Sequence, residues 1–292
     1  LPAPPPLVLL PATAQVPLRQ QPYDRWTAPD GVSAAEFRRS ADGYRIRFVG
    51  QADFSISLDP LRVHAVPAPG VTPALVEALH TNAVLPLLGN HCGRLHLHGS
   101  AVAAPGGAAG FLGLSRSGKT TLAGAFARAG HPFLTEDVLA LDAAAAGALY
   151  LVQPQRPVLR LFPDSAAFLA GARAPDAAGR TGAKGDVPAG AALPAARRPA
   201  PLRGLFLLGP GTAAGVELEL LPPAAALGAL LAHAFVLDVE DKPRLAAHFA
   251  RMAALAQRVP CHRLDYPRRY AALPGVIAAV LAQLTEECLP CS

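Results

Sequence analysis

The sequence has little of what marks disordered, membrane-bound or disulfide-rich chains. Of its 292 residues only 16% are charged and 6% aromatic, whereas 51% are hydrophobic, many of them alanine. Low charge with this much apolar content excludes wholesale disorder. A chain of this length can bury a substantial core, in one large domain or two smaller ones. With 31 prolines and 26 glycines, we expect a compact protein with many rigid connections.

Cysteine is scarce, and its four positions do not form a disulfide framework in a chain of this size. Cys288 and Cys291 make one C-x-x-C, but a zinc site needs two further ligands nearby, and the adjacent Cys261 and His262 lie far away in sequence. We therefore expect free thiols. Reduced cysteines are typical of a cytoplasmic protein, which is the localisation that we expect.

Long hydrophobic runs are also missing. The most apolar window, residues 222–239, is interrupted by His233 and bounded by prolines and Asp238, which favours a buried helix over a membrane span. Residues 1–17 lack a positively charged start and are broken by prolines, unlike a signal peptide. The sequence predicts no association with a membrane.

Positive charge exceeds negative charge only modestly. The net charge of +5 favours acidic or phosphorylated ligands. Residues 258–269 are basic, but only Tyr266 and Tyr270 could offer a stacking platform for bases. Nucleic acid is therefore not the expected partner, and the sequence leaves homo-oligomerisation open.

Alternating and helical patterns give an order of elements. Residues 1 to about 40 are proline-rich, and residues 44–66 alternate apolar and polar side chains as in an antiparallel meander. A helix is expected after Thr72 and Pro73, which suit its N-cap and first turn. We predict an N-terminal proline-rich and β-rich segment over 1–84 and an α/β domain over 85–292.

The second part alternates predicted strands with predicted helices. A hairpin over 94–114 leads into a glycine-rich loop and a helix that ends near Gly130. The segment 170–201 has little periodicity and is either a functional loop or disordered. Strands are further expected over 131–142, 147–154, 202–210, 216–222 and 261–267, and helices over 224–235, 244–257 and 274–286.

The glycine-rich loop carries the strongest motif. Residues 113–120, GLSRSGKT, fit G-x-x-x-x-G-K-[ST] at every fixed position, between a short apolar strand and a helix. Glycines let successive backbone N–H groups turn toward phosphate oxygens, and the helix directs its positive dipole end at the same anion. We predict that nucleotide phosphates bind to Gly113, Ser115, Arg116, Ser117, Gly118, Lys119, Thr120 and Thr121.

Two acids follow this loop in the sequence. Glu136 and Asp137 come directly after a short apolar run, where adjacent carboxylates can divide the work of holding Mg²⁺ and accepting a proton. Thr120 and Glu136 are the predicted Mg²⁺ ligands. His98, at the end of the preceding strand pattern, could be brought close to the acids by the hairpin.

At this point the residues resemble a known family. His98-Gly99, the hairpin and GLSRSGKTTLAGAFARAGHPFLTED (113–137) are similar to the catalytic domain of the HPr kinase/phosphorylase family. The similarity covers about 85–165 and is greatest to the shorter HPr-kinase-like proteins, some of which phosphorylate lasso-peptide precursors. It implies an α/β P-loop kinase domain of the HPr kinase / phosphoenolpyruvate carboxykinase-like type, using ATP and Mg²⁺. It also implies that Asp137 is the base on a serine hydroxyl, with His98 beside it.

The sequence departs from that family at Glu136, where an Asp is usual, and residues before 85 do not resemble the regulatory domain of true HPr kinases. The leading hypothesis is a kinase whose acceptor is a serine of a peptide or small protein. There are two alternatives: a small-molecule kinase, and an ATP-sensing accessory protein without transfer activity. Charge on the transferred group would be neutralised by Arg160, or by a basic residue of a later loop: Arg180, Lys184, Arg197 or Arg198.

Overall fold

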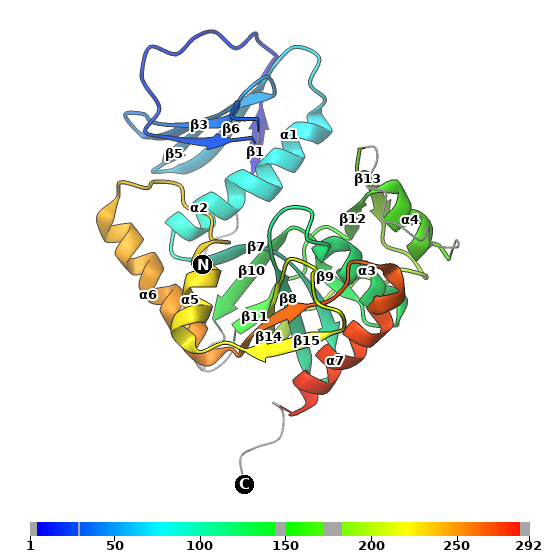
Figure 1. The fold of residues 1–292 in the computed structure, drawn as a ribbon. Coiled ribbons are helices and arrows are strands. Elements are labelled where there is room, and N and C mark those ends of the chain that lie inside the picture. The colour runs from blue at the N-terminus through cyan, green and yellow to red at the C-terminus, as the bar shows by residue number, and fades with distance from the viewer. Residues whose placement is uncertain (1–4, 29, 144–149, 172–182, 287–292) are drawn as a thin grey trace. The chain divides into compact units, whose positions relative to one another are not determined.

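The structure is a computed structural model that describes residues 5–28, 30–143, 150–171 and 183–286 (Figure 1). Contacts divide the chain into two compact units. The first unit comprises Leu1–Cys92 with Val236–Leu245, and the second comprises Gly93–Phe235 with Ala246–Ser292. The predicted boundary after residue 84 stays a prediction, while the contacts join a late segment of the chain to the first unit.

The first unit contains a six-stranded sheet in the order β1-β6-β5-β4-β3-β2. Neighbouring strands are antiparallel, except that β1 runs parallel to β6. The meander predicted over 44–66 is confirmed, whereas the three strands before it were not predicted. The strands are β1 (Leu7–Leu9), β2 (Asp24–Thr27), β3 (Ser33–Arg39), β4 (Gly43–Phe48), β5 (Ala52–Leu58) and β6 (Leu61–Pro67).

A helical segment follows this sheet. It consists of α1 (Pro73–Leu79), the π-helical turn η1 (His80–Val84) and α2 (Leu85–His91). The Thr72 hydroxyl caps α1 by accepting from the backbone N–H of Leu75, as predicted. Phe54 of the sheet and Val76 of α1 are fully buried, so apolar burial contributes to the stability of this unit.

The second unit is built on an eight-stranded mixed sheet, which bears out the expected α/β class. Its order is β11-β10-β7-β8-β14-β16-β15, and β9 also pairs with β7. Strands β8, β14 and β16 are parallel, and the other neighbours are antiparallel. The strands are β7 (Leu95–Ala104), β8 (Gly107–Leu112), β9 (Phe133–Thr135), β10 (Val138–Ala143), β11 (Tyr150–Val152), β14 (Ala200–Leu208), β15 (Glu217–Leu220) and β16 (Cys261–Asp265).

Helices cover both faces of this sheet (Figure 1). On one face Phe126 of α3 and Val280 of α7 are buried against Phe111. On the other face Leu230 of α5 and Leu255 of α6 are buried with the sheet residues of a second cluster. The helices are α3 (Lys119–Arg128), α4 (Pro163–Leu169), α5 (Pro223–Leu231), α6 (Lys242–Arg258) and α7 (Leu273–Glu286).

The three parallel strands fix where a ligand can bind. Their carboxyl ends lie at one edge of the sheet, where open α/β sheets bind ligands. The loop 113–118 follows β8, residues 209–213 follow β14, and residues 266–270 follow β16. The predicted phosphate loop therefore has two further loops beside it at this edge.

Three expectations need correction. The strand predicted over 131–142 is broken at Glu136 and Asp137 into β9 and β10, and the helix predicted over 224–235 ends at Leu231. Part of the segment 170–201 forms strand β13 (Gly185–Pro188), which pairs with β12 (Val158–Leu161), while 172–182 lie outside the described residues. No helix in the described ranges is long and apolar enough to span a membrane.

Candidate active site

The predicted phosphate loop lies between a buried strand and a helix. All six residues of β8 are buried, and α3 begins at Lys119. Gly118 has a φ of 98° and Arg116 a φ of 65°, so both adopt the left-handed conformation that reverses the chain before the helix. Backbone N–H groups in such turns converge on anions. The local backbone geometry is compatible with the predicted anion-binding loop.

Lys119 is the buried cation of this loop. Its side chain is almost fully enclosed, and Nζ donates to the carbonyl oxygens of Gly113 at 2.7 Å and Leu114 at 3.0 Å. Burial lowers the pKa of Lys119 to about 8, although the charge of Asp137 opposes this shift. The amine is therefore mostly protonated at neutral pH. Phosphate oxygens could replace the two carbonyls as its partners.

The two acids occupy a bend fixed by strand β7. Val138 pairs with His98 of β7, and the backbone N–H of Gly99 donates to the carbonyl of Asp137 at 3.1 Å. The buried hydroxyl of Thr135 donates across the bend to the carbonyl of Val138 at 2.8 Å. These contacts explain why the predicted single strand is broken here: β9 and β10 both pair with β7, and the acids project from the break.

The carboxylates have different surroundings. Burial, and then the charge of Asp137, raise the pKa of Glu136 to about 7, despite a hydrogen bond from the backbone N–H of Arg160. The Asp137 side chain is about one-third exposed, and its Oδ1 lies 3.6 Å from Nδ1 of His98. Burial and the charge of Lys119 lower the pKa of His98. A neutral imidazole therefore accompanies Asp137 at physiological pH.

Basic groups come from the β12–β13 pair. Arg160 lies on β12, and its Nε is 3.7 Å from Oδ1 of Asp186, with both side chains about half exposed. Lys184 precedes β13, and its Nζ lies 5.6 Å from the ring centre of Phe162. An ion pair this long and exposed contributes little to stability. Arg160 and Lys184 are thus available to a ligand.

These elements surround one pocket of about 280 Å³ within the second unit. Every predicted site residue lines it except Gly113 and Glu136, which border it through their contacts with Lys119 and Arg160. Lys184 is the one alternative basic residue found in its lining; Arg197 and Arg198 are not, and Arg180 lies outside the described residues. The sequence did not single out Leu161, Phe162 and Ser165, which also line it.

The donor set fits a magnesium ion only together with phosphate. No group of three or more His, Cys, Asp or Glu side chains in the described part of the chain could hold a metal. Magnesium in phosphoryl-transfer sites is held by one or two protein oxygens plus phosphate oxygens. The Thr120 hydroxyl and the desolvated Glu136 carboxylate are ligands of that kind.

Comparison with known proteins gives no family assignment. No family model matches the chain, and no curated protein matches it significantly. Among solved structures, the HPr(Ser) kinase/phosphatase from Coxiella burnetii aligns with 66% of this chain and 99% of that chain, at 10% identity and a TM-score of 0.37.

Proposed function

We propose that the protein is an ATP- and Mg²⁺-dependent kinase that transfers the γ-phosphoryl group to a hydroxyl. The observation that carries this proposal is the convergence of Lys119 and Thr120 with Asp137 and His98 in one pocket. An anion-binding loop alone would serve a nucleotide sensor equally well. A carboxylate facing that loop is what a transferase needs in addition, because the acceptor hydroxyl must lose its proton.

Binding would be the task of the loop and its first helical turn. Lys119 exchanges its contacts with the Gly113 and Leu114 carbonyls for phosphate oxygens, and backbone N–H groups of residues 115–120 surround the anion. Thr120 and Glu136 would hold Mg²⁺, which neutralises charge on the outer phosphates when bound. Arg160 and Lys184 lie in the same pocket and would neutralise the transferred group.

Proton transfer would be the task of Asp137. Its carboxylate is partly exposed to the pocket, so an acceptor hydroxyl can reach it. His98 stays neutral and lies against Asp137, where it positions the carboxylate without supplying a competing charge. The resemblance noted in the sequence favours a serine of a peptide or small protein, such as a lasso-type precursor, as the acceptor. A small-molecule hydroxyl is the second candidate.

The test is phosphoryl transfer by the Asp137→Asn variant. The native protein is incubated with ATP, Mg²⁺ and candidate acceptor peptides, and intact masses are recorded. Asparagine has the size of aspartate but cannot take the proton, so transfer should fall by about 10² or more while Mg·ATP still binds. Asp142→Asn, on strand β10 but outside the pocket lining, is the matched control and should transfer at the native rate.

Two outcomes would contradict the proposal. Native rates in Asp137→Asn would show that this carboxylate is not the base. If the native protein modifies no hydroxyl, yet its binding to a partner protein changes with ATP, it is a nucleotide sensor. The metal assignment has its own test: Glu136→Gln should raise the Mg²⁺ concentration needed for half-maximal rate.

A further inference from the structure

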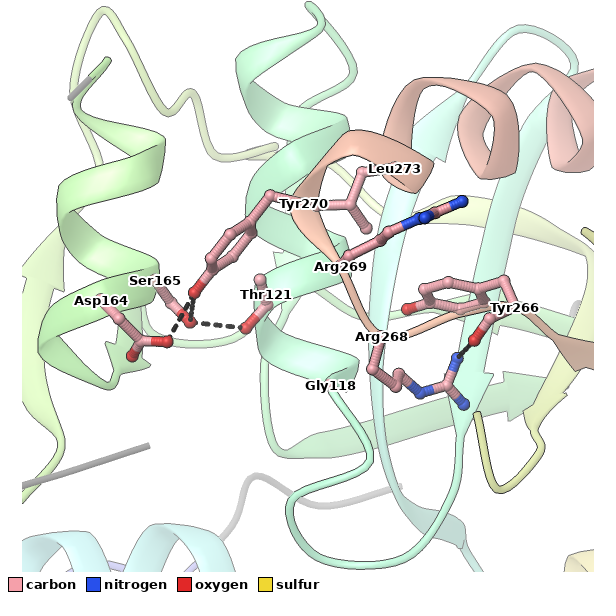
Figure 2. A pocket seen from close by; sticks show the side chains of 9 residues that line it. All are labelled: Gly118, Thr121, Asp164, Ser165, Tyr266, Arg268, Arg269, Tyr270 and Leu273. Atoms are coloured by element: carbon pink, nitrogen blue, oxygen red, sulfur yellow. Dashed lines mark hydrogen bonds between the residues drawn. The ribbon is translucent and has the colours of Figure 1, made fainter. Parts of the chain in front are cut away.

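A second pocket, of about 50 Å³, adjoins the phosphate loop (Figure 2). Gly118 and Thr121 form one side of it, and residues 266–273 contribute the other. Gly118, Thr121 and Ser165 line this pocket and the larger one alike. The two pockets therefore meet along the first turn of α3, at the carboxyl ends of β8 and β16.

Arg268 presents a flat guanidinium in the second pocket. Its Cζ lies 4.0 Å from the ring centre of Tyr266, and its two terminal nitrogens donate to the carbonyls of Tyr266 and Gly209. Asp265 lies 3.6 Å from the same group and is itself held by backbone N–H groups of residues 211–213. The guanidinium is thus fixed before any ligand arrives, which lowers the entropy cost of stacking on it.

A row of hydroxyl groups connects the two pockets. Thr121 Oγ1 lies 3.1 Å from Ser165 Oγ, which lies 3.2 Å from the Tyr270 hydroxyl. The Tyr270 hydroxyl donates to Oδ2 of Asp164 at 2.7 Å. Figure 2 shows these groups pointing toward one another from α3, α4 and the turn before α7. Such groups can exchange hydrogen bonds with the hydroxyls of a sugar.

We propose that the second pocket holds the nucleoside of the bound nucleotide. This inference rests on the proposed nucleotide binding. Lys119 and Asp137, which line only the larger pocket, receive the terminal phosphates, so the remainder of the nucleotide leaves the loop past Thr121. The sugar lies along the hydroxyl row, and the base stacks on the face of Arg268 turned away from Tyr266.

The small volume of the pocket also limits how strongly it can distinguish one base from another. A space of about 50 Å³ cannot enclose a purine, so the base lies against its rim. Stacking uses the π-face that every base has, and therefore discriminates weakly between bases. ATP and GTP should bind within a few-fold of each other.

The experiment compares Mg·ATP with Mg·tripolyphosphate, which has the phosphates but no nucleoside. Calorimetry on the native full chain should show that ATP binds about tenfold or more tightly than tripolyphosphate, the usual contribution of stacking on one base. Arg268→Ala should remove this difference and leave tripolyphosphate affinity unchanged. Arg263→Ala is the matched control, since Arg263 is an exposed arginine of β16 that pairs with Glu219.

Arg268→Lys keeps the charge but loses the planar surface, so it should behave as Arg268→Ala does if stacking is the cause. Equal affinity of ATP and tripolyphosphate in the native protein would overturn the nucleoside pocket but not the phosphate loop. The nucleoside pocket would also be overturned if Arg268→Ala lowered the affinities for ATP and for tripolyphosphate equally. A preference above a hundredfold between ATP and GTP would overturn it as well. If neither probe binds the native protein, the proposed function itself fails.

Discussion

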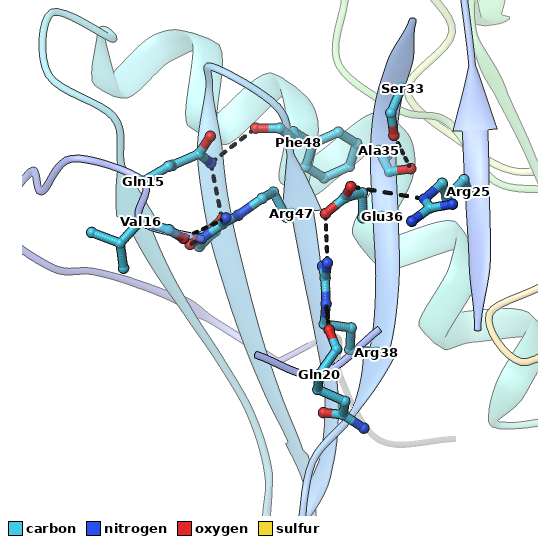
Figure 3. Close-up of polar contacts among 11 residues, drawn as sticks. Gln15, Val16, Gln20, Arg25, Ser33, Ala35, Glu36, Arg38, Arg47 and Phe48 are labelled. Atoms are coloured by element: carbon cyan, nitrogen blue, oxygen red, sulfur yellow. Dashed lines mark hydrogen bonds and ion pairs between the residues drawn. The ribbon is translucent and has the colours of Figure 1, made fainter. Parts of the chain in front are cut away.

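Charged side chains serve different purposes in the two units. In the first unit Arg47 contacts Asp53 at 2.6 Å. Arg38 contacts Glu36 at 2.7 Å (Figure 3). Arg47 also donates to the backbone carbonyl of Val16, and Arg38 donates to that of Gln20. In the second unit the groups around the large pocket are paired less closely: Arg160 lies 3.7 Å from Asp186, and the neutral His98 lies 3.6 Å from Asp137.

This difference follows from strand direction. An antiparallel meander places residues of neighbouring strands opposite one another, as it does Arg47 of β4 and Asp53 of β5. Arg38 and Glu36 lie two residues apart on one face of β3, so both pairs form within the sheet. Parallel strands instead end together and gather loops at one edge, where polar groups need not be paired by the sheet. The short ion pairs of the first unit therefore stabilise its sheet, and the weaker pairing around the pocket of the second unit supports the ligand site that we propose there.

The largest expected effect concerns the most buried charge of the pocket. Lys119→Ala should lower Mg·ATP affinity by about 2–4 kcal/mol, because a desolvated contact to phosphate is lost. The fold should persist, since removing a buried ammonium also removes its desolvation cost. Calorimetric titration measures the affinity and a thermal melt the fold. Unchanged affinity would mean that this loop does not bind the nucleotide.

The second prediction concerns a buried carboxylate that stabilises the first unit. Asp238 is almost fully buried and accepts from Arg39 at 2.6 Å and from the Tyr44 hydroxyl at 3.0 Å. Asp238→Ala should lower the free energy of unfolding by about 2–3 kcal/mol, because these donors lose their acceptor. Glu240→Ala, which removes an exposed partner of Arg39, should cost less than about 1 kcal/mol. Denaturant titration measures both, and ATP affinity should not change in either variant.

The third prediction concerns pH. Burial alone would raise the pKa of Asp265, but hydrogen bonds from four backbone N–H groups outweigh it and lower the pKa below 3.8. A carboxyl whose pKa is lower in the folded protein than in the unfolded chain stabilises the fold. This contribution is complete above the pKa of the unfolded chain and is lost as pH falls through the pKa of the folded protein. Asp265→Asn should therefore cost about 1–2 kcal/mol at neutral pH.

The same variant should cost progressively less as pH falls below about 4, because the unfolded carboxyl then binds a proton that the native carboxyl does not yet bind. Unfolding of both proteins is measured from pH 7 to pH 3. A difference that stays constant over this range would show that the ionised carboxylate is not what stabilises the loop 209–213.

The smallest expected effect lies in the phosphate loop. Arg116 has a φ of 65°, which costs a residue with a side chain about 1 kcal/mol. Arg116→Gly should raise thermal stability slightly, by less than about 1 kcal/mol, since added freedom of the unfolded chain offsets part of the gain. Gly118→Ala, at a φ of 98°, is the opposite control and should destabilise by about 1 kcal/mol. If both changes destabilise equally, the loop is not strained at Arg116.

Some features of the candidate site could be read before the fold was known. The run from Gly113 to Thr120 specifies its own turn, because its glycines, lysine and following helix are contiguous. The hairpin over 94–114 was equally local. The break between β9 and β10 was not predictable, since it depends on pairing with β7, and only that pairing brings His98 beside Asp137.

The sequence by itself determined the meander, the phosphate loop and most of the helices, because periodicity, caps and turn residues act over a few positions. Only the tertiary structure decided that Lys184 and Ser165 line the pocket, that Arg268 lies beside the loop, and that Val236–Leu245 belongs with the first unit. These contacts join distant segments: Thr121 and Ser165 are 44 residues apart, and Arg39 and Asp238 are 199 residues apart. No local pattern encodes them, because they form only when buried strands and helices have packed.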